Sequence, residues 1–103
     1  MDGSFIRTID AELRQPCAAD IHGDLLAVGE LGGRLSLYDK DNNLISRLGD
    51  EPADRAKGNG AKPEDWVEAA LVAVHGCTFD SKGDLYAQEW NKFGRLTKYT
   101  KVK

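Results

Sequence analysis

The sequence predicts an all-β fold made of two related sheets, and three observations support that prediction. The chain of 103 residues repeats itself over most of its length. The repeated segments are short apolar runs bounded by glycine turns, and only one stretch has the pattern of a helix. Apolar residues make up 41% and charged residues 30% of the chain, as in an ordinary folded domain.

The repeat has one long part and two shorter ones. PCAADIHGDLLAV (16–28) aligns with GCTFDSKGDLYAQ (76–88), and GRLSLYDK (33–40) aligns with GRLTKYTK (94–101) after one more residue of offset. GSFIRTI (3–9) is similar to NNLISRL (42–48), with Phe5 over Leu44 and Ile9 over Leu48. The chain therefore holds two copies of one structural unit and a piece that resembles its last part.

The first copy predicts four strands. Cys17–Ile21 and Leu25–Gly29 form a hairpin around Gly23, which supplies the positive φ that a tight turn requires. A glycine turn then leads to Arg34–Tyr38, and a polar turn leads to Leu44–Leu48.

The second copy predicts three strands, Cys77–Asp80, Asp84–Gln88 and Arg95–Tyr99. It has no counterpart of the fourth strand. The segment Ser4–Ile9 resembles that fourth strand and precedes the first copy, which makes eight strands in permuted order.

An insertion separates the two copies. Glu51–Ala61 is a polar loop, and a short helix is expected from Pro63 to about Leu71 because proline and acids open it. The expected organisation is a single unit with an outer strand in 1–10, a first sheet in 11–50, the insertion in 51–72 and three strands in 73–103.

Composition excludes two classes of partner. The chain has 14 Lys+Arg against 17 Asp+Glu without basic clusters, so we expect no nucleic-acid partner. No apolar run approaches the ~20 residues of a membrane span, and the N-terminus has no signal-peptide pattern. Cys17 and Cys77 are expected to be free, buried thiols at equivalent places in the two sheets.

The repeated motifs resemble NHL repeats, and their order is similar to the C-terminal end of bacterial NHL-repeat six-bladed β-propellers. The segments that carry the resemblance are DIHGDLLAV, LYDKDNNLISRLGD, PEDWV, VHGCTFDSKGDLYAQEWN and GRLTKYTKVK. The resemblance implies an NHL-type β-propeller with two four-stranded blades' worth of strands in this chain. The family includes both scaffolds and a zinc-dependent amidating lyase, so the resemblance alone fixes no activity.

The resemblance also implies self-association, because two blades leave large apolar flanks uncovered. Six blades require three chains of 11.3 kDa, a homotrimer of about 34 kDa. Ser4–Ile9 is then expected to complete the last sheet of a neighbouring chain. A four-bladed dimer and a fragment of a longer chain are the alternatives.

His75 is the first candidate site residue. In NHL propellers the residues that open the innermost strands line a central channel, and in the amidating lyase histidines there bind zinc. The resemblance leaves three interpretations of His75 open: a metal ligand, a polar channel-lining residue, or a structural histidine.

The other candidates lie near the same turns. Glu30 and Glu89 are placed to face the channel mouth, and Trp90 is placed at its rim. Arg34 and Arg95 recur at equivalent positions, which favours guanidinium groups that bridge strands or blades, with ligand binding as the alternative.

Two function hypotheses follow. The first is a binding or interaction scaffold without a cofactor, which recognises a peptide, a protein or a small molecule. The second is a metal-dependent lyase or hydrolase, in which His75 from several chains holds zinc or calcium and Glu30 or Glu89 accepts a proton. Asp20 and Asp80 suggest calcium as well, but aspartates that cap their own turns explain the same spacing.

Overall fold

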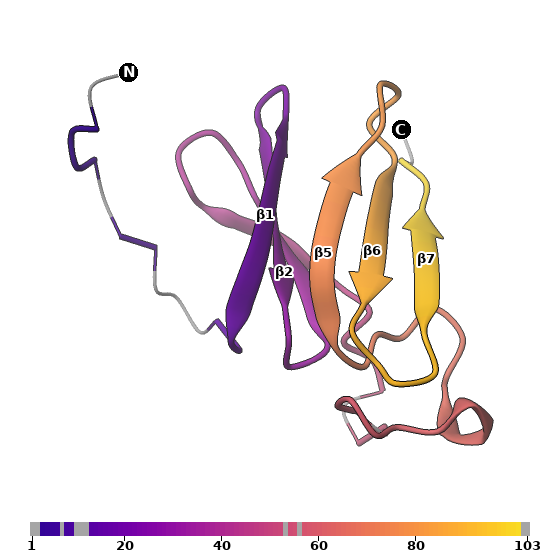
Figure 1. Ribbon diagram of the computed structural model, residues 1–103. Helices are drawn as coiled ribbons and strands as arrows, with labels where there is room; N and C mark the ends of the chain where they lie inside the picture. The colour runs from indigo at the N-terminus through magenta and orange to yellow at the C-terminus, as the bar shows by residue number, and fades with distance from the viewer. Residues whose placement is uncertain (1–2, 7, 10–12, 53, 56, 102–103) are drawn as a thin grey trace.

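The computed structural model describes residues 3–6, 8–9, 13–52, 54–55 and 57–101, and this part of the chain is all-β (Figure 1). A four-stranded antiparallel sheet of order β1-β2-β3-β4 is followed by a three-stranded one of order β5-β6-β7. Seven of the eight predicted strands are confirmed to within a few residues at their ends, Ser4–Ile9 being the exception. Their bounds are β1 Pro16–His22, β2 Leu25–Glu30, β3 Arg34–Tyr38, β4 Leu44–Leu48, β5 Val74–Phe79, β6 Leu85–Glu89 and β7 Arg95–Tyr99.

The two sheets pack against each other where β1 and β2 of the first sheet meet β5 of the second. Gly29 of β2 makes this close approach feasible, since a Cβ there would lie 2.8 Å from Cγ1 of Val74. The core between the sheets is apolar, and its fully buried members are Ala27, Leu35, Leu71, Val74, Leu85 and Ala87.

The hairpins that open the two sheets turn differently, although their sequences align. His22 pairs with Leu25 and closes a two-residue turn. Phe79 pairs with Leu85, so five residues lie between the paired ends of the second hairpin. The two hairpins therefore pair their strands in different registers, although Asp and Gly have the same spacing in both sequences.

This shift separates the roles of the two aligned aspartates. Asp80 lies in the turn, where its Oδ1 accepts the N–H groups of Lys82 (2.9 Å) and Asp84 (3.0 Å), which confirms the turn-capping prediction. Asp20 lies inside β1, and its Oδ2 accepts the N–H of Phe79 at 2.7 Å. The turn-capping prediction is wrong for Asp20, which instead joins the two sheets.

The cysteines also differ from the prediction. Both thiols are free, but Cys17 is exposed and Cys77 is only half-buried. They are not equivalent, because Cys77 pairs with Ala87 inside a regular ladder whereas Cys17 lies at an irregularity before Ala18. Burial raises the pKa of the Cys77 thiol to about 11, so this thiol stays protonated at neutral pH.

In the segment predicted to be helical, only one turn of 3₁₀ helix forms, η1 (Pro63–Asp65). The backbone is already extended at Trp66, and Ala69 has a φ of 65°. The expectation of a helix to Leu71 is wrong because the apolar end of this segment enters the core as extended chain, where the N–H of Leu71 binds the carbonyl of Gly49. Tertiary packing overrides the local helical pattern here.

The N-terminal segment pairs with no strand in the described residues. Residues 3–6 and 8–9 are the described part of the predicted strand Ser4–Ile9, and none of them lies in a ladder. Figure 1 shows the segment running away from the sheets, on the side of the molecule opposite β7. Its pairing with a neighbouring chain stays a prediction.

Candidate functional site

A buried ion pair closes one end of the first sheet. Glu30 is the last residue of β2 and is fully buried, and Arg34, 4% exposed, is the first residue of β3. The Nε of Arg34 donates to both carboxylate oxygens of Glu30 at 3.0 Å. The carboxylate also accepts the backbone N–H of Arg14 (2.6 Å) and the hydroxyl of Ser36 (2.5 Å).

The second sheet repeats this arrangement. Glu89 ends β6 and Arg95 begins β7, and the Nε of Arg95 donates to Glu89 Oε2 at 2.5 Å. Glu89 Oε1 accepts the N–H of Val72 at 2.6 Å. Val72 precedes β5 by two residues, just as Arg14 precedes β1 by two. We call each of these units, Glu30 with Arg34 and Glu89 with Arg95, a Glu–Arg clamp.

The two clamps contain four of the predicted site residues and give each of them a structural contact. Each carboxylate joins the chain ahead of the first strand to the beginning of the third strand, and its acceptors are occupied by protein donors. The structural interpretation of Arg34 and Arg95 as bridges between strands is confirmed. Glu30 and Glu89, expected to face a channel mouth, lie buried among these donors.

His75 and Trp90 remain as exposed candidates. His75 lies near the beginning of β5 and Trp90 follows β6; Trp90 is 55% exposed. Their ring centroids are 6.0 Å apart with an interplanar angle of 45°, which is the range of an aromatic contact. The two side chains form an exposed aromatic pair at one end of the second sheet.

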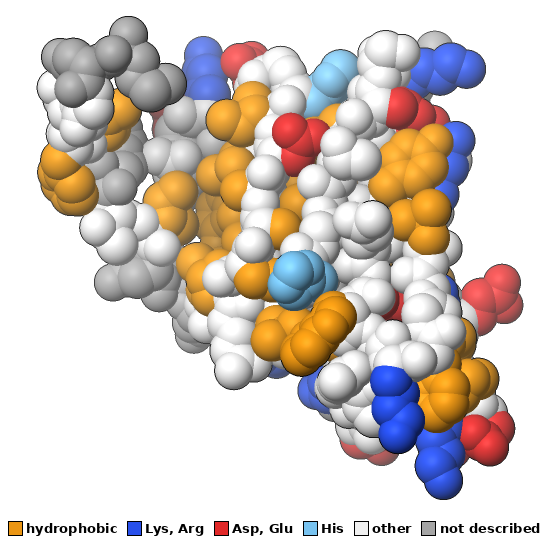
Figure 2. All heavy atoms as spheres, in the orientation of Figure 1, with side chains coloured by type: hydrophobic (Ala, Val, Ile, Leu, Met, Phe, Trp, Pro, Cys, Tyr) orange, Lys and Arg blue, Asp and Glu red, His pale blue; other side chains and the backbone are white. Residues whose placement is uncertain are grey.

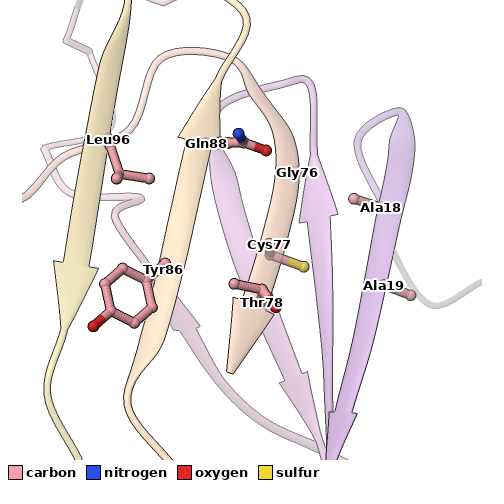
Figure 3. A pocket seen from close by; sticks show the side chains of 8 residues that line it. All are labelled: Ala18, Ala19, Gly76, Cys77, Thr78, Tyr86, Gln88 and Leu96. Carbon is pink, nitrogen blue, oxygen red and sulfur yellow. The ribbon is translucent and has the colours of Figure 1, made fainter. Parts of the chain in front are cut away.

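A groove on the second sheet includes Gly76, the neighbour of His75 in the chain, among its lining residues, and we call it the flank groove (Figure 3). It has a volume of about 550 Å³ and runs from β1 across β5 and β6 to β7. Tyr86 and Leu96 supply its apolar surface on the last two strands, and Gln88 and Thr78 supply polar groups. The remaining lining residues are Ala18, Ala19, Gly76 and Cys77.

A second groove of about 530 Å³ lies between the outer strands of the two sheets, and we call it the edge groove. Ile45 and Leu48 of β4 form one wall, and Tyr99 of β7 forms the other. Leu25, Leu37, Phe79, Gly83, Leu85, Lys98, Thr100 and Lys101 complete the lining.

Sequence reasoning missed Arg55, which organises the insertion. Its side chain is buried although the residue lies in a polar loop. The guanidinium donates to the carbonyls of Leu71 (2.9 Å), Asp50 (2.6 Å), Pro52 (3.1 Å) and Gly33. A lone arginine among loop residues carries no sequence signal for such a role, because its partners are backbone atoms.

Asp50 was not predicted as a site residue either, and its carboxylate lies close to three arginines at the end of the first sheet. Its carboxylate lies 2.8 Å from Arg14, 3.6 Å from Arg34 and 3.7 Å from Arg55. Partial burial raises the pKa of Asp50, but the hydrogen bond and charge of Arg14 and the other guanidinium groups outweigh it and hold the pKa below its usual value.

Metal binding has no ready-made site within the part of the chain that the structure describes, where no three His, Cys, Asp or Glu side chains are grouped to hold an ion. Zinc or calcium binding by His75 would need further copies of the chain around an axis. It stays a prediction.

Asp20 provides a test of the contact between the sheets. The hydrogen bond from the Phe79 N–H lowers the pKa of Asp20 below 3.8, its ordinary value. A lowered folded pKa gives a stabilisation that is present above 3.8 and is lost as the pH falls toward the folded value. We expect Asp20→Asn to make stability less dependent on pH in that range.

Thermal melts at about pH 7 and pH 3 measure this effect. Asp24→Asn, at an exposed position of the adjoining turn, is the matched control. An equal loss of stability on acidification in the parent and in Asp20→Asn would contradict the role of Asp20.

Comparison with family models, curated proteins and solved structures found no match to this chain. Among the described residues, no helix has the length and apolar character needed to cross a membrane.

Proposed function

We propose that this chain is an NHL-type β-propeller segment that acts as a binding and interaction scaffold, with several copies assembled into one ring. The observation that carries the proposal is that the two copies in the sequence form two similar sheets. Two antiparallel sheets pack face to face through their first strands, and each is closed at the same end by a Glu–Arg clamp. Successive blades of a propeller have this relation.

Self-assembly is favoured by the surfaces that the single chain leaves open. Ile21 on β1 is 68% exposed and Leu96 on β7 is 64% exposed, and the flank groove lies between these two strands on the open side of the second sheet. A sheet with apolar side chains on an uncovered face is stabilised when another sheet covers it. Six blades correspond to a homotrimer.

The ligand-binding part of the proposal rests on His75 and Trp90. An exposed aromatic pair with a polar ring nitrogen suits a peptide, a protein or a small molecule that offers both apolar and hydrogen-bonding groups. The clamp of Glu89 with Arg95 holds the strand ends beside this pair, so the pair is carried on a rigid part of the fold.

Light scattering coupled to size exclusion tests the assembly. We expect a mass of about 34 kDa, three chains of 11.3 kDa, that persists on dilution. Electron microscopy should show a closed ring with a central channel. A folded monomer at all concentrations would contradict the proposal.

A further inference from the structure

The second sheet has an open outer edge. β7 pairs with β6 on one side, and the described residues place no strand on its other side. In the first sheet the corresponding side of β3 is occupied by β4. Unpaired backbone N–H and C=O groups of an edge strand accept a further strand readily.

The edge groove adds an apolar receptor beside this open edge. Its walls are the apolar side chains of β4 and the ring of Tyr99, which is half-buried at the edge of the core between the sheets. A strand added to β7 would lie along the groove and place alternate side chains into it.

The N-terminal segment has the properties of the missing strand. Phe5 and Ile6 are each 81% exposed, although they are large apolar residues. Residues 3–9 align with residues 42–48, which contain β4, the strand that fills the corresponding place in the first sheet. Figure 2 shows hydrophobic side chains of the N-terminal segment standing apart from the sheets at the left of the view.

We propose that residues 3–9 of a second copy of this chain add to β7 as an antiparallel fourth strand, with Phe5 in the edge groove. This inference deepens the proposed function, because it names the contact through which the copies assemble.

The register follows from the first sheet. Leu44 pairs with Tyr38 and Leu48 pairs with Leu35, and an irregularity of the ladder between Leu37 and Tyr38 puts these two pairs on opposite faces, although Leu44 and Leu48 are four residues apart. Transferred through the sequence repeat, these pairs place Phe5 opposite Tyr99 and Ile9 opposite Leu96. Residues directly opposite each other share a face of the sheet.

This register matches Phe5 and Ile9 to open surfaces. Tyr99 faces the edge groove, so Phe5 enters it. Leu96 faces the opposite side and is 64% exposed, so Ile9 covers it. The pairing therefore buries apolar surface on both faces of the new strand.

The donor is a second copy because donor and acceptor lie on opposite sides of one chain. The N-terminal segment is on the far side of the first sheet from β7, with both sheets between them (Figure 1). Such a head-to-tail contact is heterologous and generates a ring when its rotation closes.

Cysteine cross-linking of the full chain tests the register. Phe5→Cys and Tyr99→Cys are introduced together in a Cys17→Ala, Cys77→Ala background, and the oxidised protein is analysed on a non-reducing gel. We expect covalent bands of two or more chains that revert to one chain on reduction, because directly opposite residues lie within reach of a disulfide.

The matched control moves one cysteine by a single residue. Phe5→Cys with Lys98→Cys places the second thiol on the other face of β7, and we expect at least a tenfold lower yield of the covalent bands. Equal yields for the two pairs, or a disulfide within one chain, would overturn the inference.

The same samples separate this inference from the proposed function. An assembly of the expected mass in which residues 5 and 99 do not cross-link would overturn strand addition and leave the assembly in place. A folded monomer by light scattering would overturn both.

Discussion

Replacing Glu30 by alanine is expected to lower the free energy of unfolding by about 3–5 kcal/mol, the range for breaking a buried ion pair by removal of one partner. Arg34 is 4% exposed and would lose the carboxylate that binds its Nε, keeping the longer contact of 3.6 Å with Asp50. The hydroxyl of Ser36 and the N–H of Arg14 lose the same acceptor. Urea denaturation followed by circular dichroism measures the change.

The double variant Glu30→Met, Arg34→Met is the control for this prediction. It removes both charges and fills similar volume, so we expect it to recover most of the lost stability. Glu89→Ala should cost less than Glu30→Ala, because the Arg95 side chain is 17% exposed and keeps the carbonyl of Ala70 and the ring of Trp66 as partners. A loss below about 1 kcal/mol for Glu30→Ala would contradict a buried clamp.

The strands and their order could be predicted from the sequence because glycine turns mark the ends of each apolar run. Gly33 and Gly94 adopt φ of 94° and 75°, and each precedes the arginine that begins a third strand. Such turns are local, so the residues that make them carry the information.

The clamps could not be predicted, because they depend on pairing between segments of different length. Glu30 precedes its arginine by four residues and Glu89 by six, so the two carboxylates do not align when the glycines and arginines do. A glutamate at the end of an apolar strand, followed by Gly-Arg, was the signal present in both copies. The ion pair can be recognised only when the strand pairing brings each glutamate next to its arginine.

The conformation of the insertion likewise depends on long-range contacts. The segment from Trp66 to Leu71 has a helical pattern, but its last residues bind Gly49, just after β4, and Arg95 of β7. Trp66 packs against Arg95 with the guanidinium carbon 4.6 Å from the ring centroid, which fastens the insertion to the second sheet. Arg55 fastens the loop part of the insertion.

Replacing Arg55 by methionine is expected to release the insertion and to lower the free energy of unfolding by about 3 kcal/mol, since several buried carbonyls lose a charged donor. The guanidinium holds carbonyls of the insertion, of the β2–β3 turn at Gly33 and of Leu71 in the core. One side chain thus connects three segments. Methionine keeps the length and the apolar stem, so the loss reports the hydrogen bonds.

Hydrogen exchange distinguishes this local effect from general unfolding. We expect the amide of Leu71, which binds the carbonyl of Gly49, to exchange at least tenfold faster in Arg55→Met while amides of β2 and β6 keep their protection relative to global stability. Arg55→Lys should behave like methionine, because a single ammonium cannot reach acceptors that the planar guanidinium spans. Lys57→Met, at an exposed position of the same loop, is the control that should change neither stability nor exchange. If Arg55→Lys retained full protection at Leu71, the positive charge alone would suffice, and the proposed role of the guanidinium geometry would be wrong.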